Sequence, residues 1–139
     1  MIIIKNLFIL EVEKLNKKNR IYPRAIIEQW IDNLKNSKPP YYKIEYTGKL
    51  NVEHFKTEYV RKSLYCGVVN DIYFTNNLVY GSIKLMPNHP LLTDIYKDES
   101  ILDNMVLSPK SLCMIHKNEM KISELIGFNL IFKNQSPFL

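Results

Sequence analysis

The stretch Leu64–Met86, LYCGVVNDIYFTNNLVYGSIKLM, decides the type of fold. Two runs rich in β-branched and aromatic residues, Leu64–Phe74 and Leu78–Met86, flank the short polar sequence TNN. Runs of this composition, joined by a few turn-forming residues, are typical of a β-hairpin. The stretch therefore predicts two antiparallel strands.

A second pair of strands is indicated towards the C-terminus. The runs Met105–His116 and Met120–Phe132 flank Lys117-Asn118-Glu119, a polar connection suited to a hairpin. Between the two hairpins, Pro90 opens the sequence PLLTDIY, whose apolar residues have the spacing of a short helix.

The clearest helix signal lies upstream, at Pro23, because proline is tolerated in a first helical turn. Apolar residues then recur every three or four positions, at Ile26, Ile27, Trp30, Ile31 and Leu34. The helix is expected to bury this stripe and to expose Arg24, Glu28, Asp32 and Lys35.

The N-terminal run Met1–Leu10, MIIIKNLFIL, is too short to span a bilayer, and Lys5 and Asn6 interrupt it. It also lacks the cleavage site of a signal peptide. We expect a buried first strand and no membrane contact. Residues Asn36–Tyr42, NSKPPYY, read as a loop-rich spacer.

The element order is strand, helix, several strands, short helix, strands. This order predicts a single α+β domain over residues 1–139, built on an antiparallel or mixed sheet that could close into a barrel. With 139 residues, 46% of them hydrophobic, the chain is long enough for one compact core.

The chain carries a net charge of +5, which would suit an acidic partner such as nucleic acid. A basic nucleic-acid-binding module is therefore one interpretation, and a solvated basic turn is the other. The cations gather only at Lys14, Lys17, Lys18, Arg20 and Arg24.

The sequence contains no motif for binding a cofactor or a metal ion. Cys66 and Cys113 lie in apolar stretches, which indicates buried free thiols in a reducing cytoplasm. No Cys and His pair has zinc spacing, no glycine-rich phosphate loop is present, and the acidic residues lack ligand-spaced companions. We therefore predict no cofactor and no metal site.

The sequence EVEKLNKKNRIYPRAIIEQWIDNL, Glu11–Leu34, resembles the prohead maturation proteases of T-even-type tailed bacteriophages. The shared pattern is a strand, an Asn-rich basic turn, Arg20-Ile21-Tyr22-Pro23 and an amphipathic helix. Tyr22 can pack as a hydrophobic staple before the helix. Similar landmarks follow in the same order, so that the resemblance covers residues 7–138: GKLN at 48–51, NNLVYGSIKLMPNHPLLTDI at 76–95, NMVLSPKS at 104–111 and LIGFNLIFKNQSP at 125–137.

The resemblance implies a β-barrel flanked by helices, related to the herpesvirus assemblins. It also implies a serine endopeptidase that cuts scaffold and capsid proteins inside the immature head. The protein would then lie in the prohead or virion, assembled in the bacterial host cytoplasm.

Three catalytic positions depart from the family pattern. Where the family has a histidine after Gly-Glu-Leu-Asn, this chain has Val52, which cannot accept a proton. His54 lies two residues on, roughly 6 to 7 Å further along an extended strand. The first of the family's paired serines is Leu107, which leaves only Ser108, and an acidic residue of the closing landmark is Asn129.

These substitutions predict a degenerate protease with no catalytic residues. The expected function is a structural component that binds capsid, scaffold or portal-proximal proteins, with tyrosine-rich strands and the C-terminal NQSPFL as contacts. A monomer and a homo-oligomer both remain open.

The alternative is an active serine protease with a shifted dyad. His54 would be the general base, and Ser108, or else Ser111, would be the nucleophile. Asn51 or Glu53 would orient the imidazole. The other two histidines, His89 and His116, fall in a predicted loop and at a strand end, and are read as surface residues.

Overall fold

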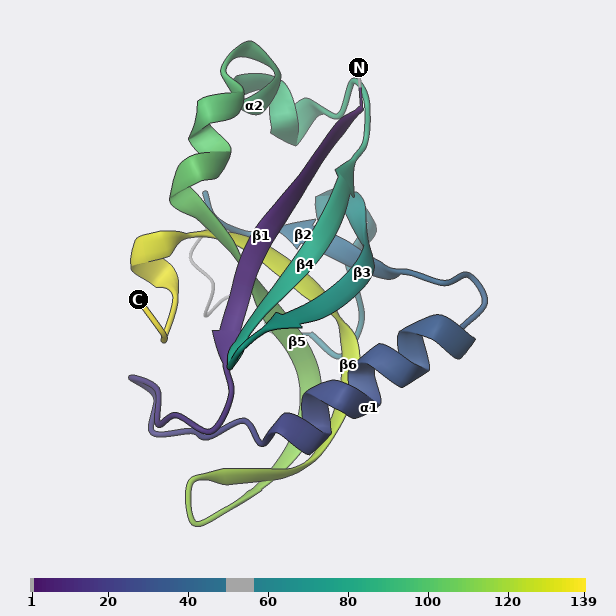
Figure 1. Cartoon of the computed structure of the whole chain (residues 1–139). Coiled ribbons are helices and arrows are strands. Elements are labelled where there is room, and N and C mark those ends of the chain that lie inside the picture. Colours follow the sequence, from purple (N-terminus) through teal and green to yellow (C-terminus); the bar gives the residue numbers. More distant parts are fainter. Residues whose placement is uncertain (1, 50–56) are drawn as a thin grey trace.

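A computed structural model describes residues 2–49 and 57–139. Six strands form one sheet in the order β1-β4-β3-β2-β6-β5, which curls into a half-barrel (Figure 1). No helix among the described residues is long and apolar enough to cross a bilayer. The elements are β1 (Ile3–Glu11), α1 (Arg24–Asn36), β2 (Tyr42–Tyr46), β3 (Tyr65–Thr75), β4 (Leu78–Leu85), α2 (Thr93–Lys97), β5 (Met105–His116) and β6 (Glu119–Phe132).

The sheet is mixed. Neighbouring strands are antiparallel except for β2 and β6, which run parallel. The two edge strands, β1 and β5, approach each other through side chains. An added Cβ on Gly81 of β4 would meet Leu107 Cδ1 at 3.0 Å and Ile9 Cδ1 at 3.2 Å. The bare backbone of Gly81 thus makes room where the two edges meet.

Helix α1 packs against β3 and β6 and closes one side of the core. Four residues of the predicted apolar stripe, Ile26, Ile27, Trp30 and Leu34, are buried, and Ile31 is partly buried. Trp30 meets Tyr22 edge-on with ring centroids 6.1 Å apart. Arg24 differs from the prediction because it is only partly exposed. Its guanidinium lies 4.0 Å from the Phe74 ring centroid and donates to the Asn76 carbonyl at 2.6 Å.

Both predicted hairpins are present, as β3–β4 and β5–β6. Their turns contain residues with positive φ, namely Asn76, Lys117 and Asn118, as tight hairpin turns require. The predicted short helix forms as a 3₁₀ turn from Pro90 that continues into α2.

Several expectations need correction. The first strand is not wholly buried, because Ile4 alternates outward with 70% of its surface exposed. The spacer predicted at Asn36–Tyr42 is confirmed except at its ends, because Asn36 closes α1 and Tyr42 begins β2, a strand that was not predicted. In the C-terminal segment, Phe138 packs against the rings of Phe8 and Tyr22.

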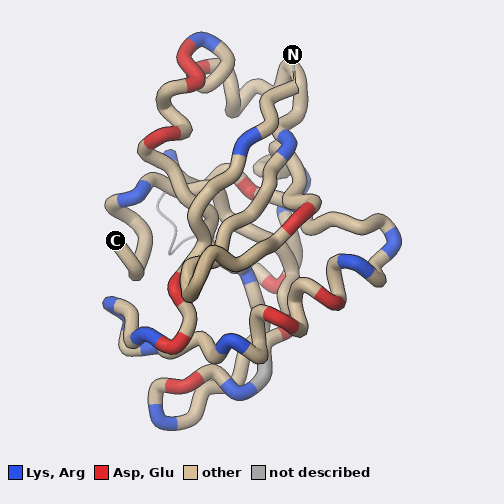
Figure 2. Tube along the Cα trace, viewed as in Figure 1, with Lys and Arg blue, Asp and Glu red and all other residues tan. Residues whose placement is uncertain are grey.

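The charges are spread over the molecule, with both signs interspersed (Figure 2). In the basic turn before α1, the Asn16 side chain accepts hydrogen bonds from the backbone N–H groups of Lys18 and Arg20, at 2.8 and 3.1 Å. The turn is therefore ordered by its own backbone and by a polar cap.

Candidate functional site

One row of side chains crosses three adjacent strands and includes the predicted nucleophile. Ser108 of β5 pairs with Asn129 of β6, which in turn pairs with Glu45 of β2. Successive residues of a strand point to opposite faces. Leu107 is fully buried in the main core, so Ser108 faces away from that core and is partly exposed.

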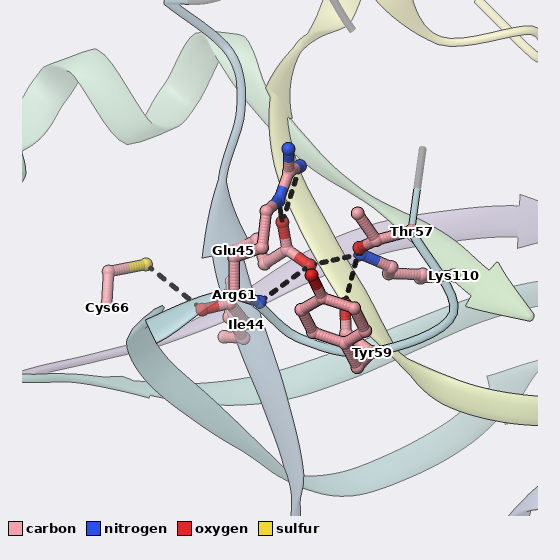
Figure 3. A network of polar contacts seen from close by, with 7 residues as sticks. All are labelled: Ile44, Glu45, Thr57, Tyr59, Arg61, Cys66 and Lys110. Carbon is pink, nitrogen blue, oxygen red and sulfur yellow. Dashed lines mark hydrogen bonds and ion pairs between the residues drawn. The ribbon is translucent and has the colours of Figure 1, made fainter. Parts of the chain in front are cut away.

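Glu45 is the centre of a buried ion cluster (Figure 3). Because Glu45 lies in one row with Ser108 across the strands, the cluster is on the face that carries Ser108. None of the Glu45 surface is exposed. Its Oε2 accepts from Arg61 Nε at 3.1 Å and from the Arg61 terminal nitrogen at 2.9 Å. Its Oε1 accepts from the Lys110 ammonium and, at 3.3 Å, from the Arg61 backbone N–H. One carboxylate thus binds two cations.

Thr57 links this cluster to residues 57–61. Its hydroxyl accepts a hydrogen bond from Lys110 Nζ and donates to the Tyr59 carbonyl at 2.6 Å. Lys110 follows Ser108 by two residues and therefore shares its face of β5. The cluster holds residues 57–61 against β2 and β5, beside Ser108.

Gly127 allows residues 57–61 to lie this close to the sheet. A Cβ on Gly127 would stand 2.7 Å from the Lys43 carbonyl oxygen and 2.8 Å from Val60 Cγ2. Gly127 pairs with Lys110 across the β5–β6 ladder. The glycine and the ion cluster are therefore neighbouring parts of one arrangement.

The cluster has the chemistry of an anchor. A buried carboxylate is costly unless it is paired and hydrogen-bonded, and both Glu45 oxygens have partners. The Lys110 side chain joins Glu45 to Thr57, so it ties β2 and β5 to the chain at residue 57. We infer that these groups fix the backbone beside Ser108.

The nearby thiol is also unsuited to nucleophilic chemistry. Cys66 is buried, and its Sγ donates to the Ile44 carbonyl at 3.6 Å. Burial raises the pKa of this thiol to about 12. Since the thiolate is the reactive form, Cys66 is inert in the folded chain. Cys113, predicted to be buried, is only partly so.

The histidine and valine at the centre of the catalytic question, His54 and Val52, lie outside the described residues, as do Asn51 and Glu53. In residues 2–49 and 57–139, no hydrogen bond joins a histidine to Ser108 or Ser111.

The other two histidines have separate places in the fold. His116 ends β5, eight residues from Ser108 and so roughly 26 Å away along the strand. His89 Nδ1 accepts from the Leu91 backbone N–H and caps the turn before α2. Ser111, three residues beyond Ser108, points to the opposite face of β5.

No sequence signal identified the ion cluster. Its pairs are 16 residues apart for Glu45 with Arg61 and 65 apart for Glu45 with Lys110. The sequence around Glu45 gives only a local hint. Glu45 stands between Ile44 and Tyr46, two residue types that are common in buried strands.

Among the described residues, neither the surface hollow nor the metal-ligating residue types point to a second functional site. A shallow hollow of about 480 Å³ lies beside Gly48 and Phe132, and neither Ser108 nor the ion cluster lines it. Within the part of the chain that the structure describes, no group of three or more His, Cys, Asp or Glu residues could hold a metal ion.

Comparison with known proteins adds information on the fold. No protein-family model and no curated protein sequence matches the chain. Among solved structures, the chain is similar to the capsid assembly protease of bacteriophage T4, with a TM-score of 0.63 and 16% identity. The match covers 93% of this chain and 81% of that one. The chain therefore has a mixed α+β, half-barrel fold like that of a phage capsid assembly protease.

Proposed function

We propose that the chain is a non-catalytic, protease-fold component of a tailed-phage head or prohead, which binds capsid or neighbouring head proteins. The fold it shares with a capsid assembly protease supports the connection to the head. The proposal extends to the finer kinship with the herpesvirus assemblins and to assembly in the host cytoplasm.

The observation that carries the non-catalytic reading is the environment of Ser108. A serine nucleophile needs a proton acceptor within hydrogen-bond reach. Among the described residues, Glu45, Arg61 and Lys110 form the ion cluster beside Ser108, and there Glu45 binds both cations. Moreover, Pro109 has no backbone N–H to offer a developing oxyanion.

An active serine protease is the second candidate, and one contact favours it. Thr57, only three residues after His54, touches Lys110, which lies two residues after Ser108 on the same face. Residue 57 thus lies beside the strand that carries the predicted nucleophile. In this alternative His54 is the base, Ser108 the nucleophile, and the ion cluster fixes residues 57–61.

Labelling with a fluorophosphonate probe separates the two candidates. We expect no labelling of the purified chain, and no cleavage of the scaffold and capsid precursors encoded in the same genome. Ser108→Ala and Ser111→Ala are the matched controls. Labelling of the native chain that disappears only in Ser108→Ala would overturn the proposal and establish the protease.

Binding is tested separately, by co-expressing the tagged chain with the head proteins of the same genome. We expect the chain to sediment with assembled proheads and to resist a salt wash. Binding to DNA instead of proheads, with affinity that falls steeply as salt is added, would point to the nucleic-acid-binding alternative.

A further inference from the structure

The outer end of β5 exposes an apolar strand edge. Leu112, Met114 and Ile115 are 43%, 64% and 40% exposed, which places three large hydrophobic residues within four positions. β5 is an edge strand of the sheet, and the β5–β6 hairpin extends beyond the other strands (Figure 1). A long, apolar, unpaired edge is a template for pairing with another strand.

The edge of β5 is also regular, which suits such pairing. Two irregularities interrupt the β5–β6 ladder, after Lys110 and after Met114. In both, the extra residue belongs to β6, as Ile126 and Lys121. Edge strands are commonly protected by bulges of their own. β5 has none between Lys110 and His116, so its backbone presents an uninterrupted row of groups.

Pro109 indicates which backbone groups face the open edge. Proline occurs in edge strands where the missing N–H would have pointed outward. Backbone groups alternate along an antiparallel strand, so those of Ser111, Cys113 and Ile115 share the outward direction of Pro109. Their N–H and C=O groups are free to continue the sheet.

We propose that two copies of this chain pair through the edges of β5, antiparallel, about a two-fold axis at Cys113. In this register Leu112 lies opposite Met114 of the second copy, and Ser111 lies opposite Ile115 of the second copy. The outward backbone groups of residues 111, 113 and 115 then bond across the axis. A continuous sheet joins the two half-barrels.

The charge distribution favours a second copy as the occupant. Residues 111–115 carry no charged side chain, so an antiparallel self-pairing places no like charges opposite each other. The nearest cation along the strand, Lys110, forms an ion pair with Glu45. Leu112 meets Met114 on one face and Cys113 meets its own copy on the other, which is the self-complementarity that a two-fold interface requires.

Sedimentation over a concentration series tests the pairing. We expect a dimer for the native chain and a dimer weakened by about 100-fold for Met114→Lys, since a lysine would be buried at the centre of the interface. Ile4→Lys, at an equally exposed position on the opposite sheet edge, is the matched control and should remain dimeric. A native chain that stays monomeric at every concentration, or a Met114→Lys dimer of native strength, would overturn the proposal.

Oxidative cross-linking tests the register. Residues in a hydrogen-bonded antiparallel pair have Cα atoms about 5.5 Å apart, which a disulfide can span. Copper-phenanthroline should therefore yield a reducible covalent dimer through Cys113, which Cys113→Ser abolishes. Cys66 is fully buried and cannot substitute for it. A dimer by mass that gives no Cys113 cross-link would overturn the paired-edge arrangement. Both tests are independent of whether the chain has protease activity.

Discussion

Glu45 shows how one residue controls the polar face of the sheet. It is fully buried, and its two oxygens bind Lys110 and Arg61, which come from distant parts of the sequence. Breaking a buried ion pair by removing one partner leaves an uncompensated charge, which is far more costly than losing an exposed pair. The stability of this face therefore depends on the carboxylate.

Replacing Glu45 with Gln should lower the free energy of unfolding by about 3 to 5 kcal/mol, because Lys110 and Arg61 lose their shared counter-charge. Urea denaturation near neutral pH measures this change. The matched control is Lys5→Ala, which removes an exposed pair with Asp103 and should cost less than about 1 kcal/mol. Equal stabilities of Glu45→Gln and the native chain would show that the cluster is not an anchor.

The buried phenol of Tyr22 should make the folded chain less stable at alkaline pH. Burial raises the pKa of its phenol from 10.0 to about 12. The phenol of the unfolded chain ionises first, so this group's contribution is fully present below pH 10.0 and is lost as the pH rises to about 12. Tyr22→Phe keeps the ring and cannot ionise.

Unfolding of both proteins by guanidinium, repeated across that pH window, measures the effect. The native chain should lose about 2 to 3 kcal/mol relative to Tyr22→Phe, since each pKa unit corresponds to about 1.4 kcal/mol. Parallel curves for the two proteins would mean that Tyr22 is not buried in the folded chain.

At the scale of elements, the hairpins could be predicted and β2 could not. Both hairpins combine long β-rich runs with turn residues that tolerate positive φ, so the signal is local and strong. β2 has five residues, follows Pro39 and Pro40, and contains Lys43 and Glu45. Short length, prolines and charges together favour a loop. Only pairing on both sides, with β3 and β6, makes this segment a strand.

Gly127 is the position where β6 accommodates β2 and residues 57–61. Gly127→Ala should cost about 1 to 3 kcal/mol, because its Cβ would press on the Lys43 backbone and on Val60. Hydrogen exchange should also speed up for the amides of β2. Glu124→Ala, an exposed change on the same strand, should alter stability by no more than about 0.5 kcal/mol. Unchanged exchange in β2 for Gly127→Ala would contradict this packing.

At the scale of the whole molecule, the candidate site is a product of strand order. Ser108, Asn129 and Glu45 form one row only because β2 pairs parallel with β6, between strands far apart in sequence. Periodicity predicts which face of its strand Ser108 occupies. It cannot predict which strands become neighbours, and so it could not place Lys110 beside Glu45. The order of elements predicted the α+β sheet, whereas the ion cluster depends on which strands lie side by side.

The C-terminal segment, β1 and α1 meet in one aromatic junction of the core. Phe138, near the C-terminus, packs on Phe8 of β1 and on Tyr22, which contacts Trp30 of α1. Phe138→Ala should therefore destabilise the chain by about 2 kcal/mol, less than a fully buried phenylalanine, because the ring is partly exposed. Since Trp30 is the only tryptophan, its fluorescence reports on this junction.

In Phe138→Ala, the unfolding curves from Trp30 fluorescence and from far-ultraviolet circular dichroism should still coincide, because the chain ends and the half-barrel share one core. Tyr59→Ala, which removes a ring that is 63% exposed, should leave both curves at the native midpoint. Separation of the two curves in Phe138→Ala would mean that α1 and the C-terminal segment unfold independently of the sheet. That result would contradict a single core joined by the aromatic junction.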